Sequence, residues 1–135
     1  MSRRRPAQAG LEFALAMPIL LLLILGVLDA GRVVIAAVSL NNAAREGARY
    51  AALHVYDGTC SNASANCLVE VRGIVANVAL GVDTTQLRPF TVSVTGTPPS
   101  IVRVALSYPF AAISPLIGSA VGDVNVTASS SMLAR

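Results

Sequence analysis

The sequence predicts an α+β protein in which a long N-terminal helix crosses a membrane in its first half and continues into a small outer domain. Three observations lead to this fold class. An uncharged apolar block occupies residues 13–28, a helical pattern without proline continues from residue 19 to about Val55, and apolar and polar residues alternate in three segments after residue 89. A chain of 135 residues has room for one membrane segment and one small domain.

The composition indicates a membrane protein and argues against a nucleic-acid partner. Hydrophobic residues make up 54% of the chain and charged residues 13%, which is too apolar for a soluble domain of this size. Three of the ten basic residues lie within the first five positions, so the rest of the chain is nearly neutral. A nucleic-acid surface would need a basic patch with aromatic residues, and the sequence has no such patch after the N-terminus.

The N-terminus combines a basic start with an acid at the edge of the apolar block. Arg3, Arg4 and Arg5 precede Glu12, and Phe13 follows it directly. Basic residues in front of a membrane helix hold the N-terminus in the cytoplasm, which places the C-terminal domain on the extracytoplasmic side. A carboxylate at the mouth of such a helix is costly, so Glu12 requires an explanation.

Two simpler interpretations explain the anchor without explaining Glu12. A cleaved secretory signal would need small neutral residues where Asp29 and Arg32 stand, and the apolar pattern continues beyond them. The alternative that we retain is an uncleaved single-pass anchor that carries an extracytoplasmic binding module. In that case residues 13–28 would span only about 24 Å of a hydrocarbon core about 30 Å thick. Asp29 and Arg32 are three apart on a helix, where they can pair and let the helix continue.

A third interpretation gives Glu12 a role. Residues 3–23 (RRRPAQAGLEFALAMPILLLL) resemble the N-terminus of the TadE-like family, the pseudopilins of tight-adherence pilus systems. Members share a basic leader, a cleavage site, four residues, a glutamate and a proline inside the apolar run. In this chain the basic leader contains Arg3 to Arg5, and Ala7 precedes the cleavage site. The four residues are Gln8 to Leu11, the glutamate is Glu12, and the proline is Pro18. Residues 41–52 (NNAAREGARYAA) resemble the family's segment after the membrane helix, and the resemblance is looser beyond them.

This resemblance implies a processed assembly subunit. A prepilin peptidase would remove residues 1–7 by cutting between Ala7 and Gln8, which leaves a positive amine on Gln8. Glu12 would then pair with the amine of a neighbouring pilin or pseudopilin subunit and set the register of the N-terminal helices. Glycine usually precedes the cut in prepilin-type leaders, and a cut after Gly10 remains open as an alternative that leaves Glu12 second in the mature chain. The family further implies a place in a pilus or its secretion machinery.

Residues 8–56 are expected to form one helix of about 70 Å, about half of which lies outside the bilayer. Small residues recur at every fourth position of its outer half, and small residues let helices approach closely. The two rows are Ala43, Gly47, Ala51 and Ala44, Ala48, Ala52. They are expected to pack against a second subunit, against this chain's own C-terminal domain, or against each along different stretches.

The outer domain is expected to cover residues 57–135 and to contain a disulfide between Cys60 and Cys67. The loop between these cysteines is polar and lies outside the cytoplasm, where disulfides persist. Closing so short a loop would stabilise the fold by about 2–3 kcal/mol.

One amphipathic helix and a roughly three-stranded antiparallel sheet are expected in this domain. The helix is predicted over residues 68–82, and the strands over 90–95, 102–108 and 124–133, with a hairpin at the proline pair 98–99. The crossover at residues 109–123 carries Phe110, Ile113, Leu116 and Ile117. These four form either a partner-binding patch or a loop that folds over the sheet.

The sequence predicts no catalytic activity. Its acidic residues form no close pair in the outer domain, and it has no phosphate-binding loop and no nucleophile elbow. The single histidine, His54, has no cysteine or serine partner nearby, and two cysteines with one histidine do not make a zinc site. We therefore expect no metal, no cofactor and no small-molecule substrate.

Overall fold

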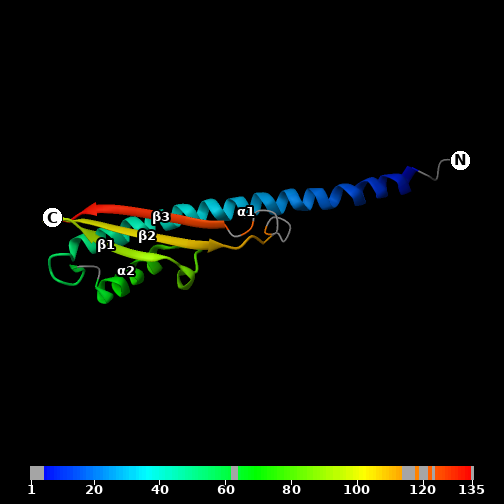
Figure 1. Cartoon of the computed structure of the whole chain (residues 1–135). Helices are drawn as coiled ribbons and strands as arrows, with labels where there is room; N and C mark the ends of the chain where they lie inside the picture. Colours follow the sequence, from blue (N-terminus) through cyan, green and yellow to red (C-terminus); the bar gives the residue numbers. More distant parts are fainter. Residues whose placement is uncertain (1–4, 62–63, 114–117, 119–121, 123, 135) are drawn as a thin grey trace.

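The computed structural model describes residues 5–61, 64–113, 118, 122 and 124–134 of the chain. Its elements are, in order, α1 (Arg5–Leu53), α2 (Ala65–Val78), the short 3-10 helix η2 (Thr84–Gln86), β1 (Phe90–Thr95), β2 (Ile101–Phe110) and β3 (Val124–Leu133). The outer domain packs along the C-terminal half of α1, while the N-terminal half of this helix extends away from it (Figure 1). The predicted α+β fold is confirmed.

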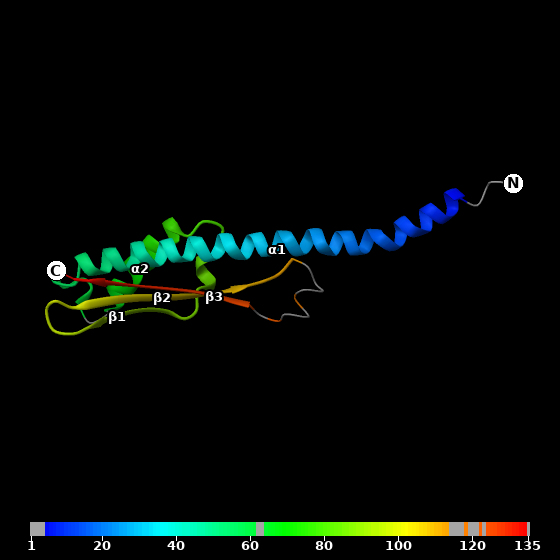
Figure 2. The ribbon, with the colours of Figure 1, turned by 90° about the horizontal axis from the view of Figure 1, so that it is seen from above.

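α1 is a single helix of 49 residues, about 74 Å long at the usual rise per residue. Pro18 lies inside it and cannot donate the helix hydrogen bond, which loosens a helix locally without ending it. Figure 2 shows α1 bending in its blue, N-terminal part, the part that contains Pro18. The helix therefore continues from the expected membrane segment into the outer domain with no linker between them.

The three strands form one antiparallel sheet in the order β1-β2-β3. The register pairs Val92 with Val104 and Val104 with Ser130, so β2 lies in the centre. Buried residues alternate with exposed ones on β2, where Val102 and Val104 face the core and Arg103 faces solvent. The strands and the β1–β2 hairpin were predicted correctly, and β2 is longer at both ends than expected.

The second helix is displaced toward the N-terminus from its predicted position at residues 68–82. α2 begins earlier because Ser64 caps it: the Ser64 side-chain oxygen accepts a hydrogen bond from the backbone N–H of Cys67 at 3.2 Å. It ends at Val78 because Ala79 leaves the helical conformation, and Gly81 follows with a φ of +71°. Val82, expected on the apolar face of the helix, is buried in the segment that follows.

The disulfide between Cys60 and Cys67 is formed, and both residues are fully buried. It joins the segment after α1 to the first turn of α2. The chain turns at Asp57, whose carboxylate accepts a hydrogen bond from the backbone N–H of Thr59 at 2.9 Å. This hydrogen bond holds the pKa of Asp57 below its usual value.

The core lies between the C-terminal half of α1, α2 and the inner face of the sheet. Gly47 lies where these elements meet. A Cβ atom at this position would lie 3.0 Å from Cγ1 of Val71, 3.3 Å from Cγ2 of Val75 and 3.7 Å from Cγ1 of Val104. The side chains of α2 and β2 therefore lie so close to this position that a larger residue would require them to move.

Replacing Gly47 with leucine should lower the free energy of unfolding of the outer domain by about 1–3 kcal/mol, because the new side chain overpacks the contact with Val71 and Val75. Urea unfolding of the detergent-solubilised protein, followed by circular dichroism, measures the change. Gly73→Leu is the matched control, since Gly73 lies on α2 with no atom within 4 Å of the position of a Cβ. Equal unfolding midpoints for the two variants would contradict the close contact at Gly47.

Candidate functional site

The N-terminal half of α1 is largely apolar, and its residues 8–24 are all exposed. Of the described residues, one helical stretch, Gln8–Leu53, is long and apolar enough to cross a membrane, and its most apolar window is not buried at all. Up to residue 28, the exposed large apolar side chains of this stretch are Leu11, Phe13, Leu15, Met17, Ile19, Leu20, Leu21, Leu22, Leu23, Ile24, Val27 and Leu28. So large an apolar surface requires lipid or protein around it.

Glu12 is exposed on α1 within this surface. Its neighbours Leu11 and Phe13 each keep 65% of their surface accessible. Gln8 is exposed as well and precedes Glu12 by four residues, so the two lie on the same side of the helix, about 6 Å apart along its axis. Ala7 belongs to the same helix, whereas Arg3 and Arg4 lie outside the described residues.

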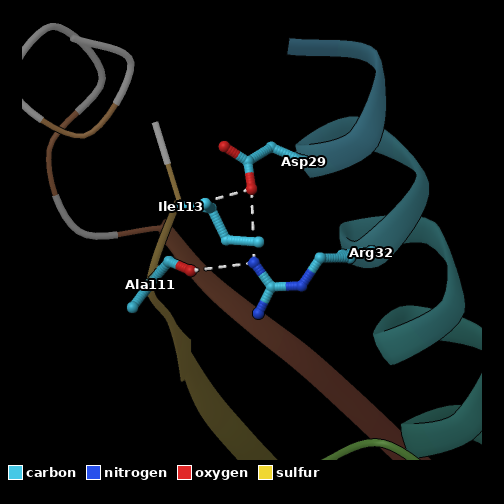
Figure 3. A network of polar contacts seen from close by, with 4 residues as sticks. All are labelled: Asp29, Arg32, Ala111 and Ile113. Atoms are coloured by element: carbon cyan, nitrogen blue, oxygen red, sulfur yellow. Dashed lines mark hydrogen bonds and ion pairs between the residues drawn. The ribbon is translucent and has the colours of Figure 1, made fainter. Parts of the chain in front are cut away.

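A polar cluster marks the point where α1 meets the outer domain (Figure 3). The predicted pairing of Asp29 with Arg32 is confirmed, since Arg32 Nη1 lies 3.2 Å from Asp29 Oδ1. The same Asp29 oxygen accepts a hydrogen bond from the backbone N–H of Ile113 at 3.0 Å. Arg32 in turn donates to the backbone carbonyl of Ala111 at 3.4 Å. The pair therefore fastens the segment after β2 to α1.

In this cluster the buried carboxylate of Asp29 has both an ion-pair partner and a hydrogen-bond donor. Asp29 is only 4% exposed, and an unpaired carboxylate at such a position would be costly. The side chain of Arg32 keeps 46% of its surface accessible and lies over the ring of Phe110, with its central carbon 5.0 Å from the ring centroid. The sequence indicates the Asp29–Arg32 pair by its spacing, but no local signal identifies Ile113, which is 84 positions away.

A small cavity of about 210 Å³ lies next to Asp29, between α1 and the ends of β2 and β3 that face the membrane segment. Gly26 and Ala30 contribute to its wall from α1, and Phe110 and Val124 from the sheet. The wall is otherwise mostly apolar, so the cavity is suited to an apolar group rather than to a charged ligand.

Both rows of small residues on α1 are buried against this chain's own α2 and sheet. Their members Ala43, Ala44, Ala48 and Ala51 have no accessible surface, and Ala52 keeps 6%. Any contact of the outer half of α1 with another subunit would therefore use the opposite face. Arg45 and Arg49 are exposed on that side, where Arg49 lies 3.5 Å from Glu46.

The apolar residues of the crossover at residues 109–123 differ in how far they are buried. Phe110 is buried at the end of β2, whereas Ile113 keeps 60% of its surface accessible. Leu116 and Ile117, the other two members of the expected patch, lie outside the described residues.

His54 stacks on Tyr50 with ring centroids 4.1 Å apart, and its Nδ1 atom lies 2.8 Å from the Tyr50 carbonyl oxygen.

The anchor and the helix that follows it match a known family. Residues 8–49 match the model of the TadE-like protein family. This match bears out the predicted TadE-like resemblance over that segment. No curated protein and no solved structure matches the chain. The TadE-like segment contains Glu12, the Asp29–Arg32 pair and Gly47, and it ends before the disulfide.

Asp29→Ala should release the segment after β2 from the TadE-like helix, because the N–H of Ile113 and the guanidinium of Arg32 both lose this carboxylate. A hydrogen bond to a charged group contributes about 1.5–3 kcal/mol. Its loss should therefore make the amide hydrogen of Ile113 exchange about 10–100-fold faster. Hydrogen–deuterium exchange measures this rate. Glu46→Ala removes the exposed pair of the same spacing and should leave it unchanged, and equal exchange at Ile113 in both variants would refute the clamp.

Proposed function

We propose that this chain is a non-enzymatic pseudopilin-like subunit that a prepilin peptidase processes and that takes part in assembly of a tight-adherence pilus or its secretion machinery. The observation that carries the proposal is a single carboxylate, Glu12, exposed at the start of an apolar helix inside a TadE-like segment. The membrane and other pilin or pseudopilin subunits are its proposed partners.

The surroundings of Glu12 supply the argument for an intersubunit charge pair. The accessible apolar side chains of Leu11, Phe13 and Leu15 require an environment with little water. An isolated carboxylate in that environment carries a large desolvation cost, which a positive charge nearby offsets. After cleavage the amine of Gln8 in a neighbouring subunit is such a charge, and it reaches Glu12 only when the two helices stand in one register.

Two independent features support the proposed orientation of the chain. The arginines at positions 3–5 favour an N-terminus in the cytoplasm. The disulfide between Cys60 and Cys67 is of a kind that persists in oxidising compartments, which favours an extracytoplasmic outer domain. Both features support a peptidase site at the cytoplasmic end of α1 and a sheet outside the cytoplasm.

The mature protein should begin at Gln8 after expression with its prepilin peptidase, because that cut leaves Glu12 at the fifth position. Intact mass and N-terminal sequencing measure the new end. A start at Leu11 would place the cut after Gly10, and an intact leader would favour an uncleaved single-pass anchor with an extracytoplasmic binding module. Ala7→Gly restores the residue usual for the family and should be processed at least as well as the natural sequence.

Glu12→Ala should leave membrane insertion intact and reduce incorporation into pili to background, because the amine of the neighbouring subunit loses its partner. Sheared pilus fractions and membrane fractions, probed for the subunit, separate these two effects. Glu12→Asp keeps the charge and should retain part of the incorporation, while Glu46→Ala removes an acid from the outer half of α1 and should have no effect. Normal piliation with Glu12→Ala would refute the charge-pair role.

A further inference from the structure

The exposed apolar surface of α1 does not end where the outer domain begins. Asp29 faces the domain, but on the opposite face of the helix Val34, Ile35 and Val38 keep 61%, 62% and 56% of their surface accessible. Their spacing continues the stripe that starts with Val27 and Leu28. Polar residues take over only after Val38, where Asn41 and Asn42 are exposed.

The length of this stripe fits a bilayer better than the uncharged block alone. From Phe13 to Leu28 the helix rises only about 24 Å, which is less than the hydrocarbon core of about 30 Å. A core that begins at Phe13 would end near residue 33, and the headgroup region would add about 5–7 Å and end near Val38. The outer edge of the hydrocarbon core would then lie next to Arg32 and about one helical turn beyond Asp29, close to the segment attached to them.

The charges at this level are suited to an interface. Asp29 is buried, its charge is balanced by Arg32, and its oxygen also accepts a hydrogen bond from the Ile113 N–H, so it does not oppose contact with lipid. Arg32 remains partly accessible and can extend its guanidinium toward lipid phosphates. Ile113 is held at this level by its hydrogen bond to Asp29 and exposes 60% of its surface.

We propose that the base of the outer domain is seated in the outer interfacial layer of the bilayer, with Ile113 on one side of α1 and Val34 and Ile35 on the other in contact with lipid. We call these three residues the seating surface. The proposal rests on α1 crossing the membrane, as the proposed function requires. It adds that the bilayer also holds the domain, by way of apolar residues that lie beyond the uncharged block.

Single tryptophan residues can test this contact, because the natural chain contains no tryptophan. The full-length protein would be reconstituted into phosphatidylcholine–phosphatidylglycerol vesicles whose acyl chains carry bromine close to the headgroups. Ile113→Trp and Val34→Trp report on the seating surface, and Leu20→Trp reports on the membrane core. Leu53→Trp is the matched control, because Leu53 is 68% exposed at the far end of α1.

Ile113→Trp and Val34→Trp should show blue-shifted emission and lose most of their intensity to the brominated lipid, whereas Leu53→Trp should be quenched only by aqueous iodide. Iodide quenching of Ile113→Trp equal to that of Leu53→Trp would overturn the proposal. Protection of Val34→Trp from both quenchers would overturn it for the α1 face, since a second protein copy would then cover that face. Absence of lipid quenching in Leu20→Trp would instead refute the membrane anchor itself, so the two failures are distinguishable.

Discussion

The outer domain depends on how closely α1 approaches the elements that cover it. Gly47 leaves no space for a side chain of its own between Val71, Val75 and Val104, and the alanines on either side have no accessible surface. Because the sheet has three strands in the described part of the chain, this contact supplies one whole side of the core. The helix that anchors the protein is therefore also the largest structural element of the domain, and the domain cannot be separated from it without losing its core.

The same helix has to satisfy two environments, and the Asp29–Arg32 pair lies at the boundary between them. Before it, α1 is largely apolar, and residues 8–24 are exposed. After it, one face is buried by the domain and the other remains accessible. A charged pair at this boundary is tolerated because the backbone groups of Ile113 and Ala111 complete its hydrogen bonds. The same hydrogen bonds hold the segment after β2 against α1.

Much of this architecture follows from local sequence patterns. The alternation in each strand, the proline pair in the hairpin and the uninterrupted helical run predicted the elements, and the spacing of Asp29 and Arg32 predicted their pairing. The start of α2 was misplaced because a capping serine, rather than the apolar pattern, determines it. Contacts between distant segments could not be predicted from local patterns. No nearby residue type indicates that the Ile113 N–H donates to Asp29, or that Gly47 packs against α2 and β2 rather than against another subunit.

The absence of a linker between anchor and domain has a mechanical consequence. α1 runs as one helix from Arg5 to Leu53, and the sheet and α2 are packed along its second half. A force applied along the axis of α1 is therefore borne by the hydrogen bonds of the helix and by the packing of the domain on its second half. No extensible linker in the described chain takes up the force. Rotation of α1 about its axis therefore turns the domain with it, because the helix is continuous between its exposed half and the half that the domain covers.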